Sequence, residues 1–83
     1  MLEIEIARTA QKEFLHYNAK DQKIITQKIL NLESGSLVGV KKLVTQENIF
    51  RIRAGNFRII FEKLPGNILK IARIRRRNEK TYR

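Results

Sequence analysis

Four segments of the chain carry the apolar and polar patterns of β-strands. Residues 2–7 alternate leucine or isoleucine with glutamate, and residues 50–53 alternate apolar residues with arginine, the period-two pattern of strands with one buried face. Residues 57–63 continue the alternation, whereas residues 68–74 are mostly apolar on both faces, which is typical of a strand in the middle of a sheet. The sequence thus predicts one strand near its start and three near its end.

Glycine, proline and asparagine mark the turns between the last three strands. Gly55 and Asn56 separate the second strand from the third, and both residue types suit a tight hairpin turn. Residues 64–67 (Leu-Pro-Gly-Asn) have proline and glycine where the central positions of a type II turn favour them. These three strands are therefore expected to run antiparallel.

A short helix is predicted directly after the first strand. Thr9 is expected to cap it, and the helix should extend over residues 9–17. Ala10, Phe14 and Tyr17 then fall on one stripe of its surface.

A second, longer helix is predicted after a turn at residues 18–21, which also supply a cap. It should end at Ser34-Gly35, because glycine tolerates positive φ. One face of this helix is apolar throughout: Ile25, Ile29 and Leu32, widened by Ile24 and Leu30.

Residues 35–48 have no sustained period and are expected to form an irregular connection that buries Leu37, Val40 and Leu43. The order of elements is then β-α-α-β-β-β, which predicts an α+β fold of two layers, with a helical pair packed on one face of a small, mainly antiparallel sheet. A chain of 83 residues has room for one such core, so residues 1–83 are expected to form a single domain.

Because the helices cover only one face of the sheet, the opposite face should be exposed. Alternation directs Phe50, Ile52, Phe57, Ile59 and Phe61 toward the helices. It directs Arg51, Arg53 and Arg58 outward. A solvated outer face is one interpretation of these arginines. We favour a phosphate-binding face, because a guanidinium matches the geometry of phosphate and never loses its charge.

The distribution of charge supports a polyanionic partner. The formal net charge is 18 − 8 = +10. Residues 1–40 carry five basic and five acidic side chains, whereas residues 41–83 carry thirteen Lys or Arg against Glu47, Glu62 and Glu79. Such one-sided charge disfavours the folded state through self-repulsion unless a partner neutralises it. Nucleic acid is the first candidate partner, and an acidic protein is the second.

Several kinds of chemistry find no support in the sequence. There is no cysteine, no cluster of His, Asp or Glu at metal-ligand spacing, no serine nucleophile arrangement and no glycine-rich phosphate loop. His16, the single histidine, is expected to lie on the surface. No apolar segment approaches membrane-spanning length. We therefore expect a cytoplasmic protein that uses no metal or other cofactor.

The basic end of the chain holds the remaining candidates. Arg75, Arg76 and Arg77 form a run directly after the last predicted strand. Tyr82 is either a hydrophobic clip that fixes the terminus, or a base-stacking platform or general base whose pKa neighbouring arginines would lower.

Two stretches resemble the RelE/ParE superfamily of toxins from toxin–antitoxin systems. Residues 50–61 (Phe-Arg-Ile-Arg-Ala-Gly-Asn-Phe-Arg-Ile-Ile-Phe) are similar to the family's Tyr-Arg-Ile-Arg-x-Gly-x-Tyr-Arg-x-x-Tyr hairpin. Residues 76–83 (Arg-Arg-Asn-Glu-Lys-Thr-Tyr-Arg) are similar to its basic cluster followed by Tyr-Arg. With Lys41-Lys42-Leu43 and the two helices, the similarity spans nearly the whole chain.

The resemblance implies a messenger-RNA endoribonuclease that acts in the ribosomal A site, where the ribose 2′-hydroxyl attacks the adjacent phosphate. By resemblance, Arg51 and Arg53 grip the scissile phosphate and Arg58 stabilises the transition state. Either Arg76 or Arg77 matches the general acid, and Tyr82 matches the residue that orients or deprotonates the 2′-hydroxyl. Further basic residues are expected to bind RNA phosphates: Lys41, Lys42, Arg73, Arg75, Lys80 and Arg83.

The sequence departs from the family pattern in two respects. Some relatives have lysines where this chain has arginines in its first arginine-bearing strand, and arginine is a poor proton donor. A histidine found near the tail of some relatives is absent. The resemblance also implies a small acidic antitoxin as partner. ParE-like members share the fold but poison DNA gyrase, so gyrase inhibition stays open as an alternative, as does a relative that only binds RNA or an antitoxin.

Overall fold

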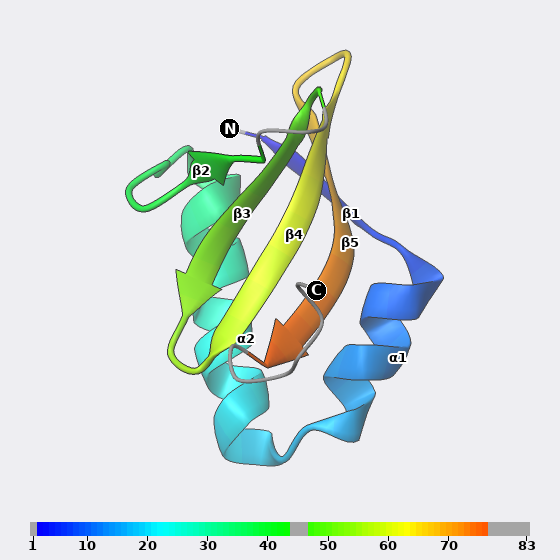
Figure 1. Ribbon diagram of the computed structural model, residues 1–83, viewed down its shortest axis with the longest axis vertical. Helices are drawn as coiled ribbons and strands as arrows, with labels where there is room; N and C mark the ends of the chain where they lie inside the picture. The colour runs from blue at the N-terminus through cyan, green and yellow to red at the C-terminus, as the bar shows by residue number, and fades with distance from the viewer. Residues whose placement is uncertain (1, 44–46, 77–83) are drawn as a thin grey trace.

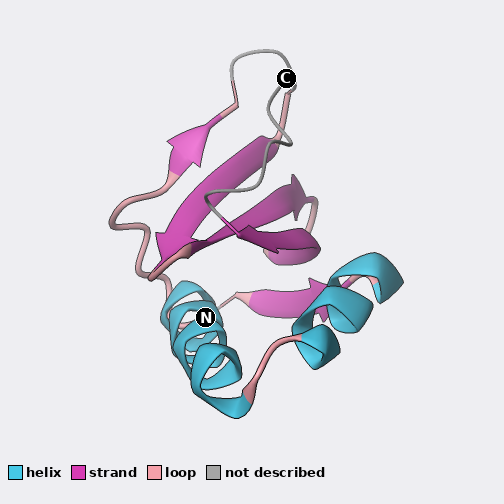
Figure 2. Ribbon diagram, turned by 60° about the horizontal axis from the view of Figure 1, so that its bottom comes forward, coloured by secondary structure: helices cyan, strands magenta, loops and turns pink. Residues whose placement is uncertain are grey.

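The computed structural model describes residues 2–43 and 47–76. In chain order they form β1 (Glu3–Ile6), α1 (Arg8–His16), α2 (Ala19–Glu33), β2 (Lys41–Lys42), β3 (Ile49–Ala54), β4 (Phe57–Leu64) and β5 (Ile68–Arg76). The strands make one sheet in the order β1-β5-β4-β3-β2, and both helices lie on the same side of it (Figures 1 and 2). The predicted two-layer α+β fold is confirmed.

The sheet is mixed, with one parallel pair. β1 runs parallel to β5, and every other neighbouring pair is antiparallel. Because β1 leads into a helix instead of a hairpin, it pairs with a strand distant in the sequence. The first and last described strands therefore lie side by side, as Figure 1 shows.

The core lies between the helices and one face of the sheet. Its strand residues are each at most 3% exposed: Ile52, Ala54, Phe57, Ile59, Phe61, Leu69, Ile71 and Ile74. Ala10, Ile25 and Leu32 of the helices are fully buried, and Phe14, Tyr17 and Ile29 pack against them. Both predicted helical stripes are confirmed. Ile24 and Leu30, however, are 37% and 50% exposed and do not widen the core.

The two helices begin differently. Asn18 caps α2 as predicted, because its Oδ1 accepts a hydrogen bond from the Asp21 amide at 2.8 Å. The predicted Thr9 cap of α1 is wrong: the N-cap is Ala7, and no side chain caps it. The Ala7 amide still donates to Ile71 in the sheet at 2.8 Å, so the chain enters the helix directly from the strand. Neither helix is long and apolar enough to cross a membrane, within the residues described.

The expectation of an irregular connection over residues 35–48 is wrong at β2. Lys41 and Lys42 pair with Arg51 and Phe50 of β3. A strand of two residues is too short to show a period in the sequence. Of the residues in this connection that were expected to be buried, Val40 packs against the core. Leu37 is 56% exposed and is not buried.

A β-bulge in β5 decides which face its residues occupy. Ile60 of β4 is opposite Arg73, but the next residue, Phe61, is opposite Ile71, so Ala72 is the extra residue. The bulge reverses the alternation, which lets Ile71 and Ile74 both face the core. The apolar character of residues 68–74 thus reflects a change of phase and not a strand that is apolar on both faces.

Glycines occupy the turns that the sequence assigned to them. Gly55 has φ of +60°, and Ala54 pairs with Phe57 across the two-residue loop. A Cβ on Gly55 would also lie 3.3 Å from Cγ2 of Ile24 on α2. Gly66 has φ of +82°, as the third residue of a type II turn requires.

Candidate functional site

Pairing between strands places three arginines in one row on the face opposite the helices. Arg53 of β3 is directly opposite Arg58 of β4, which is opposite Arg75 of β5. Since adjacent strands are about 4.8 Å apart, the row extends over about 10 Å. Each adjacent pair of like charges costs up to about 1 kcal/mol. An anion of the size of a phosphate group would remove that cost.

A second row crosses the sheet two residues away. Lys41 of β2 is opposite Arg51, Arg51 is opposite Ile60, and Ile60 is opposite Arg73. The structure therefore brings the outward arginines together with two of the predicted RNA-binding residues of β5. We call the basic members of both rows the arginine face: Lys41, Arg51, Arg53, Arg58, Arg73 and Arg75.

Glu13 of α1 binds the two arginines at the β5 end of the arginine face. Its Oε2 accepts hydrogen bonds from Nε and Nη2 of Arg73 at 3.1 and 2.9 Å, and lies 3.5 Å from Nε of Arg75. Its Oε1 accepts from the backbone amide of Ile74 at 2.7 Å. The Glu13 side chain is only 17% exposed, so these contacts form in a partly desolvated place. One carboxylate thus offsets charge on both β5 arginines of the arginine face.

Tyr17 completes the attachment of α1 to the edge of β5. β1 pairs with β5 only as far as Ile71, so beyond it no strand of the described part of the chain borders this edge. Glu13 accepts from the amide of Ile74, and the Tyr17 hydroxyl donates to the carbonyl of Ile74 at 2.9 Å. Two side chains one helical turn apart therefore satisfy the backbone where a strand would otherwise do so.

Arg76 does not belong to the arginine face. The run that was expected to follow the strand is partly inside it, since β5 continues to Arg76. Arg76 is opposite Phe57 on the helix side, with its guanidinium 5.2 Å from the Phe57 ring centroid and 5.4 Å from that of Tyr17. It also lies 3.9 Å from the Asp21 carboxylate. These contacts direct Arg76 away from the residues with which it was expected to act.

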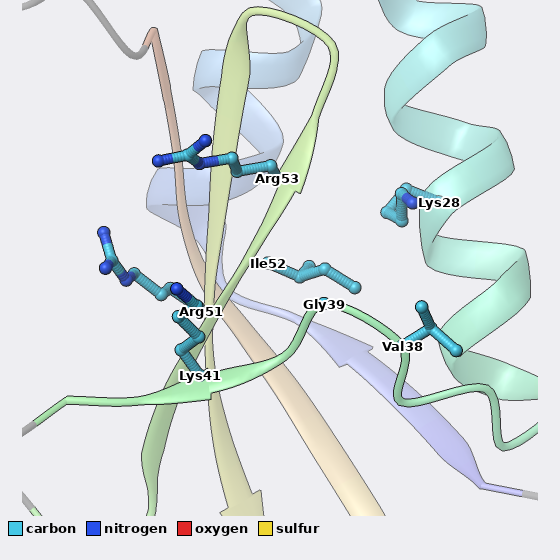
Figure 3. A pocket seen from close by; sticks show the side chains of 7 residues that line it. All are labelled: Lys28, Val38, Gly39, Lys41, Arg51, Ile52 and Arg53. Carbon is cyan, nitrogen blue, oxygen red and sulfur yellow. The ribbon is translucent and has the colours of Figure 1, made fainter.

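A hollow lies at the opposite end of the arginine face, where β3 is the outer strand. We call it the β3-edge hollow; it has a volume of about 360 Å³ and is lined by Lys28, Val38, Gly39, Lys41, Arg51, Ile52 and Arg53. In Figure 3, Arg51 and Arg53 point to one side of the strand and Ile52 points to the other, toward α2. Among the described residues, no hydrogen bond or ion pair engages its four basic side chains.

A second hollow, of about 470 Å³, lies beside α1 at the other end and includes His16, Tyr17, Arg73, Arg75 and Arg76. We call it the β5-edge hollow. Glu13 lines it as well, so its positive charge is partly offset. His16 is exposed, as expected. Over residues 2–43 and 47–76, no three His, Asp or Glu side chains gather in a way that could hold a metal ion.

The remaining candidates fall elsewhere. Lys42 is opposite Phe50 and so occupies the helix side of the sheet, away from Arg51. The other four predicted site residues lie outside the described residues: Arg77, Lys80, Tyr82 and Arg83.

The sequence did not lead us to expect a role for Glu13 or Lys28, although both have the same position in the pattern of their helices. Glu13 follows Ala10 by three residues and precedes Tyr17 by four, on the apolar stripe of its helix. Lys28 has the same relation to Ile25 and Leu32 on the second helix. A charged residue on an otherwise apolar stripe therefore marks a point where a helix meets an edge of the sheet.

A family model describing the ParE toxin of the type II toxin–antitoxin system parDE matches residues 4–81. No curated protein matches the sequence.

Solved structures of RelE toxins have the same fold. The RelB–RelE antitoxin–toxin complex of Methanococcus jannaschii matches with 30% identity and a TM-score of 0.72, over 88% of this chain and 89% of the other. The archaeal RelE–RelB complex of Pyrococcus horikoshii OT3 matches with 18% identity and a TM-score of 0.80, over 94% and 97%. The E. coli RelBE complex matches with 14% identity and a TM-score of 0.76, over 95% and 100%. The chain therefore belongs to the RelE/ParE superfamily of type II toxin–antitoxin toxins.

Proposed function

We propose that this toxin is a messenger-RNA endoribonuclease that acts on the ribosome in the cytoplasm and is held inactive by an acidic antitoxin. The observation that carries the proposal is the alignment of Arg53, Arg58 and Arg75 in one row, with Arg51 beside it. A row about 10 Å long is long enough to contact more than one phosphate group of an RNA strand, whereas a single carboxylate would contact only part of it.

In the proposed reaction the ribose 2′-oxygen attacks the adjacent phosphorus while the bond from phosphorus to the 5′-oxygen breaks. The products are a 2′,3′-cyclic phosphate and a 5′-hydroxyl. Arg51 and Arg53 bind the phosphate oxygens, and Arg58 stabilises the charge that develops on them in the transition state. Arg58 suits that role because it is half-buried at the centre of the row, where the local dielectric constant is low.

Two proton transfers complete the reaction. Tyr82 accepts the proton from the 2′-hydroxyl, and a basic residue of the tail donates one to the leaving 5′-oxygen. Of the two candidates for the donor we favour Arg77, because Arg76 is engaged with Asp21 and the aromatic rings on the helix side. Both roles remain proposals, since Arg77 and Tyr82 lie outside the described residues.

Primer extension on translated message tests the proposal. The wild-type toxin should produce cuts that disappear in Arg58→Ala and in Tyr82→Phe. Lys63→Ala, a charge removal on the same strand but on the opposite face, is the matched control and should cut normally. Unchanged cutting in both test variants would contradict the site assignment.

An antitoxin partner is supported by the related structures, three of which are described as complexes of RelE with RelB. The net charge of +10 suits an acidic polypeptide that folds on binding. The affinity of such a complex should fall as salt is added. An affinity that does not change with salt would point to apolar contacts with the helices instead.

Gyrase inhibition is the second candidate function, favoured by the match to the ParE family model. In that case expression of the toxin should cause cleaved DNA–gyrase complexes to accumulate while messenger RNA stays intact. The two functions are thus separated by one expression experiment with two readouts.

A further inference from the structure

Lys28 is a partly buried cation with no counter-charge in the described structure. It lies on the apolar stripe of α2, between Ile25 and Leu32, and is half-buried. Glu13 has the equivalent position on α1 and finds Arg73 and Ile74 as partners. Ordering a lysine side chain costs up to about 2 kcal/mol of rotamer entropy. The described residues contain no hydrogen bond or ion pair of Lys28 that would offset this cost.

The sheet edge beside Lys28 is open. β2 pairs with β3 at Phe50 and Arg51, and within residues 2–43 and 47–76 no strand pairs with residues 52–54 on that side. Among the described residues that line the resulting hollow, four are basic and none is acidic: Lys28, Lys41, Arg51 and Arg53. Its volume of about 360 Å³ falls within the usual range of small-ligand sites.

The floor of the β3-edge hollow is apolar. Ile52 is 3% exposed and points from β3 toward α2, and Val38 stands beside it on the loop before β2 (Figure 3). Val38 is 83% exposed, although its methyl groups adjoin a concave surface. The hollow therefore combines basic side chains with one apolar side chain, Val38, that folding leaves in contact with water.

We propose that the β3-edge hollow binds one nucleotide of single-stranded RNA next to the cleavage position, with Lys28 paired to its phosphate and the base or sugar against Val38. This inference rests on the proposed function, since Arg51 and Arg53 are then shared between the hollow and the scissile phosphate. A nucleotide carries both an anion and an apolar face, which matches the two parts of the hollow. A carboxylate side chain would interact only with the basic residues of the hollow and not with Val38.

The binding of fluorescent, fully 2′-O-methylated single-stranded RNA tests the proposal, because that RNA cannot be cut by 2′-hydroxyl attack. Lys28→Gln should weaken binding by about threefold to tenfold. It should also lower the slope of log K against log salt by about 0.7, the value for one phosphate contact on a single strand. Lys23→Gln, an exposed lysine on the same helix, is the matched control and should leave affinity and slope unchanged.

Val38→Ser tests the apolar part separately. It should weaken RNA binding by about twofold to fivefold without changing the salt slope, because the lost contact carries no charge. Leu15→Ser is its control, since Leu15 is 73% exposed and lines a groove on α1 and α2 away from the arginine face. Both positions are exposed, so neither substitution should affect folding.

Two results would overturn the proposal. One is equal RNA affinity for Lys28→Gln, Lys23→Gln and the wild type. The other is that Lys28→Gln weakens binding of a poly-glutamate peptide as much as it weakens binding of RNA, which would assign the hollow to an acidic protein. If the wild type cuts no message but the RNA affinities behave as expected, the cleavage function fails while the nucleotide site stands.

Discussion

The two ends of the arginine face hold the same kind of residue in opposite electrostatic states. At the β5 end, Arg73 and Arg75 share the carboxylate of Glu13, and Arg76 lies near Asp21. At the β3 end, the described residues provide no ion pair for Arg51 or Arg53. The β5 arginines attach a helix to a strand, whereas those of β3 project from the outer face of the sheet.

This difference shows that a basic patch cannot be interpreted from its charge alone. A guanidinium already paired in the folded state must exchange one anion for another when it binds phosphate, so it gains less than an unpaired one. The β3 end should therefore supply most of the RNA affinity, and the β5 end most of the stability. The following predictions test that division, from the largest expected effect to the smallest.

Deletion of Ala72 should abolish folding. Without the bulge, alternation along β5 would direct either Ile71 or Ile74 to the outer face and bring arginine to the core side. Burying an unpaired charge costs several kcal/mol, which is comparable with the total stability of a domain of 83 residues, about 4–12 kcal/mol. Circular dichroism and denaturant titration measure the effect. Ala72→Ser keeps the residue count and should remain folded; a stable, cooperative deletion variant would show that the bulge is dispensable.

Glu13→Ala should lower the free energy of unfolding by about 2 kcal/mol. The substitution leaves the buried Ile74 amide without its acceptor, and an unsatisfied buried group costs about 1–3 kcal/mol. The ion pair with Arg73 adds little, because that arginine side chain is 41% exposed. Glu13→Gln retains an acceptor and should lose less. Equal losses in both variants, measured by urea denaturation, would mean that charge and not the backbone hydrogen bond matters.

Tyr17→Phe should lower the free energy of unfolding by about 1 kcal/mol, since it removes the hydrogen bond to the Ile74 carbonyl and keeps the ring. The ring centroid of Tyr17 lies 4.6 Å from that of Phe57, so the aromatic contact should survive. Hydrogen exchange along residues 72–76 provides the second readout. Exchange in β3 should not change; faster exchange there would argue that α1 supports the whole sheet and not one edge.

Arg53→Gln should leave stability within about 0.5 kcal/mol of the wild type, as is usual for an exposed side chain, because no described residue forms an ion pair with it. It should nevertheless weaken binding of 2′-O-methylated RNA. Arg73→Gln should weaken RNA binding less, because Glu13 already pairs with that guanidinium, and should lower stability only slightly, because the ion pair is partly exposed. Equal losses of affinity in the two variants would remove the distinction between the two ends of the arginine face.

Much of this arrangement can be predicted from the sequence because it depends on local rules. Alternation alone directs Arg51, Arg53 and Arg58 outward, and the residues of the two turns set the hairpins. Local rules do not predict which residues of β5 face the core on either side of the bulge. A bulge depends on pairing with β4, and the pattern around Ala72 is equally compatible with a regular strand that is apolar on both faces.

The helices provide a second example. The spacing of apolar residues predicts the buried stripe of each helix. It does not predict which distant residue will contact a charged side chain on that stripe. Glu13 and Arg73 are 60 positions apart, and only the packing of α1 against the open edge of β5 brings them together. For the same reason the sequence does not indicate that Lys28 lines one hollow together with Lys41 and the β3 arginines.

The sequence by itself determined the order of the elements other than β2, the faces of β3 and β4, and the concentration of positive charge in the second half of the chain. These follow from periodicity, turn chemistry and composition, all of which are local. Only the tertiary structure decided which cations are neutralised and which are not. Ion pairs and sheet register join residues distant in the chain, so the difference between the end of the arginine face that Glu13 neutralises and the opposite end exists only in the folded protein.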